Sequence, residues 1–249
     1  MKSQRRWFPL AAATVILLIA GLWWINNFTN RENLLVFSTV ESEKKDFTLA
    51  DGTLVSLNEN SRLSYPAAFE NPTRMVKFSG EAYFDIAKNP SKPFIIQTTD
   101  TKVEVVGTEF NLRAYPTEVK TEILVSAGKV NFQEKTTKNS IVLIANQQGI
   151  FANGKLKKVE NPKTNTYAWK SGVLSYKDTP LKDVLLDLER VFKIKTELQN
   201  QAMGKCTLSG QFPNAQPNAI LKYAATFLKM ELVEVAKNQF RLKGGGTCE

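Results

Sequence analysis

The first clear pattern along the chain is a continuous apolar segment near its N-terminus. No charged residue occurs between Trp7 and Asn27, and the stretch Leu10–Ile25 is almost wholly apolar. At about 1.5 Å per residue, a helix from Trp7 to Ile25 would span roughly 28 Å, close to the hydrocarbon thickness of a bilayer. We therefore predict a transmembrane anchor in residues 1–27, which makes the lipid bilayer an expected partner. The residues expected to contact lipid or its interface are Trp7, Leu10, Ile16, Leu18, Trp23 and Trp24.

Basic residues set the orientation of this anchor. Lys2, Arg5 and Arg6 precede the apolar segment, and the positive-inside rule keeps such a terminus in the cytoplasm. A cleaved signal peptide has the same basic start, but its cleavage needs small residues after the apolar run. Here a leucine and two tryptophans follow Gly21, so we favour a retained, single-pass anchor in the inner membrane. Either alternative exports the rest of the chain, whose bulk is therefore expected in the oxidising periplasm.

Residues 46–153 show a different pattern, in which short apolar runs alternate with turn-forming residues. No helical period continues for ten residues anywhere in this region, so we predict an all-β domain. Many short strands suit a sandwich, a barrel or a stacked β-solenoid, and periodicity does not choose among them. The mixed, polar residues 28–45 are predicted to form a tether. The predicted strands are Leu54–Leu57, Met75–Phe78, Ala82–Ile86, Phe94–Gln97, Val103–Val106, Phe110–Tyr115, Ile123–Val125, Val130–Phe132 and Ile141–Ile144.

After a linker predicted at residues 154–168, strands alternate with helical periods. One helix is expected from Pro180 to Phe192 with Thr179 as its N-cap, and Asn214 is expected to cap a second helix. Two strand–helix–strand units make a small α+β domain in residues 169–243, followed by a tail in residues 244–249. The predicted strands are Val173–Tyr176, Ile194–Leu198, Cys206–Phe212, Met230–Val235 and Phe240–Leu242.

Composition argues against most catalytic chemistry. Hydrophobic residues make up 43% of the chain, enough for a folded core, but histidine is absent, and with it the commonest general base and metal ligand. Two cysteines cannot complete a four-thiolate zinc site, and no glycine-rich phosphate-binding motif occurs. The net charge of +9 is spread along the chain rather than gathered in a patch. We therefore expect no enzymatic activity, catalytic residue, cofactor, metal or nucleic-acid partner.

The two cysteines, Cys206 and Cys248, are candidates for a disulfide. A bridge between them would close a loop of about 40 residues, which stabilises by roughly 3–4 kcal/mol in the chain-entropy model. The glycine run Gly244–Gly246 makes closure easy but equally permits a free thiol in the tail. Both alternatives stay open at the level of sequence.

Five short blocks are the most specific feature of the chain. They are Leu49–Asn58, Ser61–Pro66, Phe78–Asp85, Pro93-Phe94 and Val106–Asn111. In order and spacing these blocks resemble the periplasmic domain of FecR-type anti-sigma regulators. The segment Trp169–Val173, with the helix that follows it, is similar to the C-terminal module of Bacteroidetes members. That module looks like the short signalling domain of secretins and TonB-dependent transducers, and the whole resemblance covers about residues 37–243.

The resemblance implies a regulatory function. Such proteins span the inner membrane, contact the signalling domain of a TonB-dependent outer-membrane transporter, and control an extracytoplasmic-function sigma factor. Members usually carry a cytoplasmic helical domain that holds the sigma factor, whereas only about eight residues precede the apolar segment here. We therefore expect that the start codon is assigned too far downstream, or that the sigma-binding part is a separate chain or lost.

The site of partner contact is expected at a strand edge, because unpaired backbone amides and carbonyls can accept a strand from another protein. Val173, Leu174, Ser175 and Tyr176 are the first candidate, and the strands Cys206–Phe212 and Phe240–Leu242 are the others. We expect Trp169 to pack between the two domains. The alternative function is a membrane-tethered scaffold or envelope-polymer binder that uses the same β domain without sigma regulation.

Overall fold

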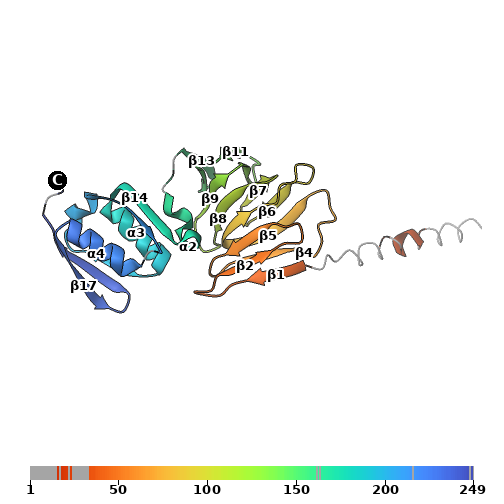
Figure 1. The fold of residues 1–249 in the computed structure, drawn as a ribbon. Coiled ribbons are helices and arrows are strands. Elements are labelled where there is room, and N and C mark those ends of the chain that lie inside the picture. Colours follow the sequence, from red (N-terminus) through yellow and green to blue (C-terminus); the bar gives the residue numbers. More distant parts are fainter. Residues whose placement is uncertain are drawn as a thin grey trace, which may run out of the picture.

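The computed structural model describes residues 16, 18–21, 23, 34–160, 162, 164–214, 216–246 and 248. A β domain and an α+β module lie side by side, with the short helix α2 (Ala168–Ser171) between them (Figure 1). Of the predicted anchor residues, Ile16, Leu18 and Trp23 are helical and exposed, whereas Trp7, Leu10 and Trp24 lie outside the described residues. Within the described part of the chain, no helix has the length and apolar character needed to cross a membrane.

The β domain is a sandwich of two sheets that share one long strand, β5 (Arg74–Asp85). The first sheet contains, in order, β1 (Leu34–Ser38), β4 (Arg62–Pro66), β5, β6 (Phe94–Gln97), β7 (Thr101–Val105), β10 (Lys129–Glu134) and β11 (Ser140–Ile144). The second contains β2 (Lys45–Thr48), β3 (Leu54–Leu57), β5, β8 (Glu109–Ala114), β9 (Lys120–Ala127), β12 (Gln147–Ala152) and β13 (Lys155–Glu160). The prediction of an all-β domain is therefore confirmed.

Strand β5 passes from one sheet to the other at Gly80. Before this residue β5 pairs with β4 and β6, and after it with β3 and β8. Gly80 has a φ of +108°, and a Cβ built there would lie 2.5 Å from the Cα of Ser61. Only glycine fits this close approach. The sequence predicted two strands, Met75–Phe78 and Ala82–Ile86, because the small and polar residues between them look like a turn.

The two sheets face each other across a single apolar core. Phe37 of β1 stacks on Phe47 of β2 with ring centroids 4.1 Å apart, which joins the sheets at one end. At the other end Gly149 of β12 lies so close to the facing sheet that a Cβ would meet Leu143 at 2.7 Å and Phe132 at 2.8 Å. Because the inward residues of both sheets share one core, the sandwich is the alternative that the structure supports.

Two predicted connections are wrong, because each contains a strand. The predicted tether, residues 28–45, includes β1, which pairs with β4. The predicted linker, residues 154–168, includes β13, which pairs with β12, and the one-turn helix η1 (Thr164–Tyr167). Both strands are mostly exposed on their two faces, so no alternation of buried and exposed residues marks them. Ladder hydrogen bonds rather than side-chain burial hold them in place.

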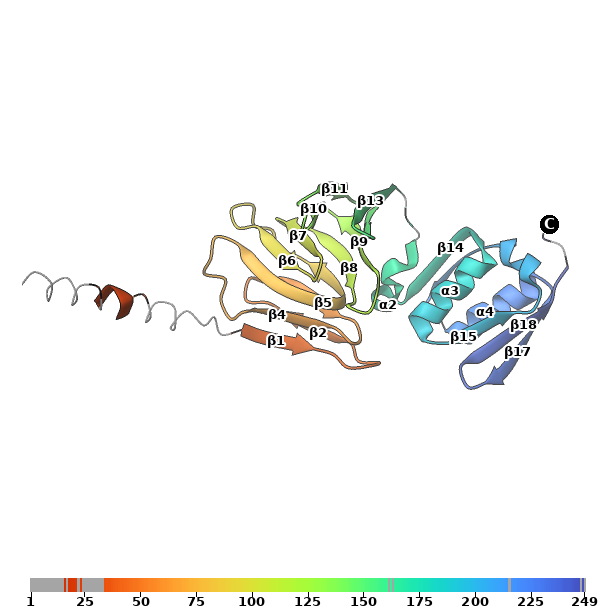
Figure 2. The same ribbon diagram turned by 180° about the vertical axis from the view of Figure 1, so that it is seen from behind.

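The α+β module contains the two predicted strand–helix–strand units. Strands β14 and β16 form an antiparallel pair, while β18 lies between β15, which is parallel to it, and β17, which is antiparallel. Helices α3 and α4 lie between these two sheets, as Figure 2 shows from behind. The elements are β14 (Val173–Pro180), α3 (Leu181–Phe192), β15 (Lys195–Leu198), η2 (Gln201–Lys205), β16 (Thr207–Pro213), α4 (Pro217–Phe227), β17 (Met230–Ala236) and β18 (Gln239–Gly244).

Both predicted helix caps are wrong by one or two residues. Thr179 belongs to β14, and its hydroxyl bonds the backbone of Lys177 instead of capping α3. Asn214 has a left-handed φ of +49°, and Gln216 is the N-cap of α4 because Pro217 takes the first helical position. Pairing of Pro180 with Thr207 extends β14 up to the helix, which local propensity did not reveal.

Gly80→Ala is expected to lower the free energy of unfolding by roughly 3 kcal/mol or more. A left-handed backbone costs an L-residue about 1–2 kcal/mol, and the added methyl group would collide with Ser61. Gly154→Ala is the matched control, because Gly154 also has a positive φ, +69°, but has nothing within 4 Å of a built Cβ. Urea unfolding followed by circular dichroism compares the two variants, and equal losses would contradict the steric account.

Candidate functional site

The joint between the two domains is the most structured polar site of the molecule. Trp169 of α2 donates its indole N–H to Oδ1 of Asn111 on β8, at 3.1 Å. Asn111 is fully buried, and its amide in turn donates to Oε1 of Glu81 on β5, at 3.0 Å. The expectation that Trp169 packs between the domains is thereby confirmed, and its polar edge is fixed by a residue of the opposite domain.

Glu81 is the centre of this joint. Its side chain is only 3% exposed, and Arg113 lies 2.8 Å from Oε2. Asn58 at the end of β3 also donates to Oε2, at 3.0 Å. Glu118 pairs with the other side of the same guanidinium. Burial lowers the pKa of Arg113, but the hydrogen bonds that Arg113 donates to Glu118 and the charges of Glu81 and Glu118 outweigh it and raise that pKa above its ordinary value. The buried carboxylate is therefore fully partnered, as a buried charge must be.

Three lysines add further bonds across the joint. Lys44, in the loop after β1, donates to the carbonyl of Trp169 at 2.7 Å. Lys170 of α2 donates to Oγ of Ser56 on β3, at 2.6 Å. Lys193, the residue after α3, lies 2.6 Å from Oε1 of Glu59. These contacts are all polar, and interfaces of this kind hold domains in register without merging their cores.

The pKa of Glu59 is lowered in part by Lys193, a residue of the other domain. Burial raises the pKa of Glu59, but the hydrogen bond from Lys193, the amide of Ser42 and the charges of Lys193 and Lys44 outweigh it. The pKa is consequently held below its ordinary value of 4.5. The ion pair thus stabilises the docked module only while Glu59 is ionised.

A cleft opens on each side of the joint. One, of about 280 Å³, is lined by charged residues of both domains, including Lys44, Glu59 and Lys193. The other, of about 800 Å³, runs between the loop after β8 and helix α3, where Val119 and Leu186 are exposed on its walls. Among the described residues, no group of three or more potential ligand side chains is arranged to hold a metal ion.

The predicted partner-binding edge on β14 is largely covered. Leu174 and Tyr176 are buried in the module core. The backbone N–H of Ser175 donates to Oδ1 of Asn165 at 2.8 Å, and Asn165 belongs to the η1 segment. Asn165 is itself buried and donates to Asp187 of α3. The expectation of an open edge at Val173–Tyr176 is therefore corrected, because a side chain of the preceding segment occupies it.

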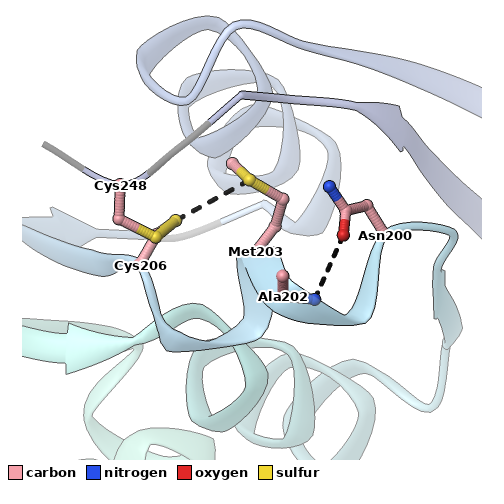
Figure 3. Close-up of a disulfide and its surroundings, with 5 residues drawn as sticks. All are labelled: Asn200, Ala202, Met203, Cys206 and Cys248. Atoms are coloured by element: carbon pink, nitrogen blue, oxygen red, sulfur yellow. Dashed lines mark hydrogen bonds between the residues drawn. A yellow bond between two sulfur atoms is a disulfide. The ribbon is translucent and has the colours of Figure 1, made fainter.

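Cys206 and Cys248 are joined in the structure, with their Cα atoms 5.1 Å apart and a separation of 42 positions in sequence (Figure 3). Cys206 directly precedes β16, so the bridge would tie the C-terminal tail to the start of that strand. Met203 of η2 packs beside it, with its Sδ 3.8 Å from Sγ of Cys206. Asn200 caps η2 by accepting a hydrogen bond from the amide of Ala202, which orders the turn before the cysteine.

Comparison with known proteins connects both domains to one family. Residues 36–131 match the family model for FecR protein, and residues 173–235 match the model for the FecR C-terminal region. The chain belongs to the FecR-type anti-sigma factor family. The two matches correspond to the β domain and the α+β module, and the family is regulatory rather than enzymatic. A sigma factor is accordingly the partner that the family implies in general.

Solved structures agree with this assignment. Two crystal structures of a candidate anti-sigma factor from Parabacteroides distasonis ATCC 8503 share 28% identity with this FecR-type chain. Their TM-scores are 0.64 and 0.65, and the matches cover 86% and 85% of this chain and all of theirs. No curated protein matches the chain significantly.

Lys193→Met is expected to destabilise docking of the module at pH 7 by about 0.5–1 kcal/mol, since the lysine is partly solvent-screened. The pKa of Glu59 is lowered in the folded protein, so its contribution is present above the unfolded value of 4.5 and disappears as pH falls through the folded pKa. The difference in urea midpoint between the variant and wild type should therefore be largest at pH 7 and shrink at pH 3. Lys158→Met, which removes the more exposed pair with Glu160, is the control and should change neither midpoint. A loss of equal size at both pH values would contradict the ion-pair account.

The disulfide remains a prediction that thiol counting can test. The full chain, purified and denatured without reductant, should contain no free thiol. Cys248→Ser should then lower stability by roughly 3–4 kcal/mol if the chain-entropy model holds. Two free thiols per chain would show that the bridge does not form.

Proposed function

We propose that this FecR-type protein is held in the inner membrane by residues 7–27 and extends its two domains into the periplasm. There it receives the state of a TonB-dependent outer-membrane transporter and relays it to an extracytoplasmic-function sigma factor. In this proposal the α+β module contacts the signalling domain of the transporter. The β domain passes the resulting change towards the anchor.

The observation that carries this proposal is the polar joint centred on Glu81. It fixes the α+β module to the β domain through side chains that are specific in geometry, because Trp169, Asn111 and Glu81 form a chain of hydrogen bonds. If the module had no defined contact with the β domain, a buried charge such as Glu81 beneath Trp169 would not be needed. The joint lets a partner that binds the module influence the β domain.

Hydrogen bonds continue from the joint to the first strand. The backbone N–H and C=O of Glu81 both bond Oγ of Ser61. The backbone N–H of Ser61 donates to Oγ1 of Thr39, and the amide of Thr39 donates to the carbonyl of Ser61. Thr39 directly follows β1, the first strand after the predicted anchor. This continuity supports a relay from the module to the membrane-proximal end of the domain.

The topology of the chain tests the proposal. A C-terminal alkaline phosphatase fusion should be active and a C-terminal green fluorescent protein fusion dark, because the positive-inside rule places the C-terminus outside the cytoplasm. The reverse pattern would contradict both the orientation and the relay, since a periplasmic signalling domain could not reach the module. With correct topology, failure of the full chain to bind that domain would favour the scaffold function instead.

A further inference from the structure

Strand β16 presents an open edge whose hydrogen-bonding groups can be assigned. Ser175 of β14 points its N–H away from β16, towards Asn165. Ser175 lies opposite Gln211, so these two residues form a pair without mutual hydrogen bonds, and the N–H and C=O of Gln211 also point away from β14. Because these directions alternate along a strand, Ser209 points outward as well. In the described part of the chain, β16 pairs with β14 alone.

The outward groups are almost unoccupied. Within the described residues, the one hydrogen bond made by the outward backbone groups of Ser209 and Gln211 comes from the hydroxyl of Tyr223, which donates to the carbonyl of Ser209 at 3.3 Å. A carbonyl has a second lone pair, so this contact leaves room for another donor. The edge therefore offers two N–H donors and two C=O acceptors to an incoming strand.

The composition of β16 leaves this edge unprotected except at its last residue, Pro213. Its residues, Thr207–Pro213, include no charged side chain. Natural proteins protect open edges with charges, and β2, β13, β15 and β17 all carry lysine, aspartate or glutamate. β1 and β11 are uncharged too. What distinguishes β16 from them, within the described residues, is the exposed aromatic surface beside it.

That surface consists of Phe212, Tyr223 and Phe227. The rings of Phe212 and Tyr223 lie 5.4 Å apart, and those of Tyr223 and Phe227 lie 6.2 Å apart. Tyr223 is 41% exposed and Phe227 is 61% exposed, although both are on α4, whose other face enters the core. An added strand would place alternate side chains over these rings, so the edge and the aromatic surface suit the same occupant.

We propose that the edge of β16 accepts one strand of the signalling domain of the transporter, which extends the β14–β16 pair into a three-stranded sheet. This inference rests on the proposed function and names the contact through which it operates. Backbone hydrogen bonds at Ser209 and Gln211 supply the affinity, and the rings of Tyr223 and Phe227 select apolar residues at alternate positions of the incoming strand.

A second copy of this chain fits the edge less well. If two β16 strands paired antiparallel, with Gln211 opposite Gln211, then Pro213 of each chain would face Ser209 of the other. Proline has no N–H, so the outward carbonyl of Ser209 would lack its donor in both chains. A strand without proline loses no bond in any register, whereas a second copy keeps all its bonds only in registers that leave Pro213 unpaired, so a different protein is the favoured occupant.

The experiment uses the full chain in nanodiscs, titrated with the purified signalling domain of the transporter encoded beside it. Gln211→Pro removes the outward N–H without removing a bond to β14, and it should weaken binding roughly tenfold or more. Gln211→Thr keeps the N–H and is the matched control, so its affinity should stay within about twofold of wild type. Phe227→Ser, on the exposed face of α4, should weaken binding without touching the edge. Hydrogen exchange of the segment 207–213 should slow when the domain binds.

The outcomes separate the two proposals. Binding by wild type together with unchanged affinity of folded Gln211→Pro would overturn the edge assignment and leave the proposed function standing. If Gln211→Pro did not fold, two other results together would overturn the edge assignment. These are an unchanged affinity of Phe227→Ser and an unchanged rate of hydrogen exchange in the segment 207–213 when the domain binds. If the wild-type protein had the correct topology but did not bind the signalling domain, both the edge assignment and the proposed function would be contradicted. Light scattering that shows a wild-type dimer and a Gln211→Pro monomer would assign the edge to a second copy and overturn the proposed occupant.

Discussion

The buried carboxylate of Glu81 is the constraint on which the arrangement of this protein depends. A carboxylate that is 3% exposed costs several kcal/mol unless hydrogen-bond donors surround it. The donors come from the end of β3, from Asn111 on β8 and from Arg113 on the same strand. The side-chain N–H of Asn111 donates to Glu81, which orients its side-chain oxygen to accept the indole N–H of Trp169. One buried charge thus orders the face of the second sheet that lies opposite the apolar core, and it prepares the place where the second domain docks.

A polar joint has consequences that an apolar one would not have. Lys44, Lys170 and Lys193 each make one bond across it, and every such bond can exchange with water when the domains separate. Polar contacts of this kind tend to leave docked and undocked states close in free energy, which would suit the proposed relay, in which the state of the protein changes when a partner binds. The predicted disulfide between Cys206 and Cys248 lies at the opposite end of the module, where it would hold the start of β16 in place during any movement at the joint.

Sequence patterns predicted most of the strands whose inward residues are strictly apolar. They missed β1 and β13, because both strands are exposed on two faces and are held by ladder bonds, and the predicted strands also lack β2, β4 and β12. They divided β5 into two, because Gly80 looks like a turn until its close contact with Ser61 is known. Sequence patterns offered three candidate strands for the partner edge, with Val173–Tyr176 first, because nothing local indicates that Asn165 covers β14.

The sequence by itself determined the two-domain order, the β and α+β character of the domains, the family and the absence of histidine chemistry. These properties follow from periodicity, composition and ordered motifs, which are local. Only the tertiary structure decided that Glu81, Asn58, Asn111 and Trp169 meet, and that β16 rather than β14 is left open. Those residues are separated by tens of positions in the chain, and their pairing depends on the closure of two sheets, for which no local pattern exists.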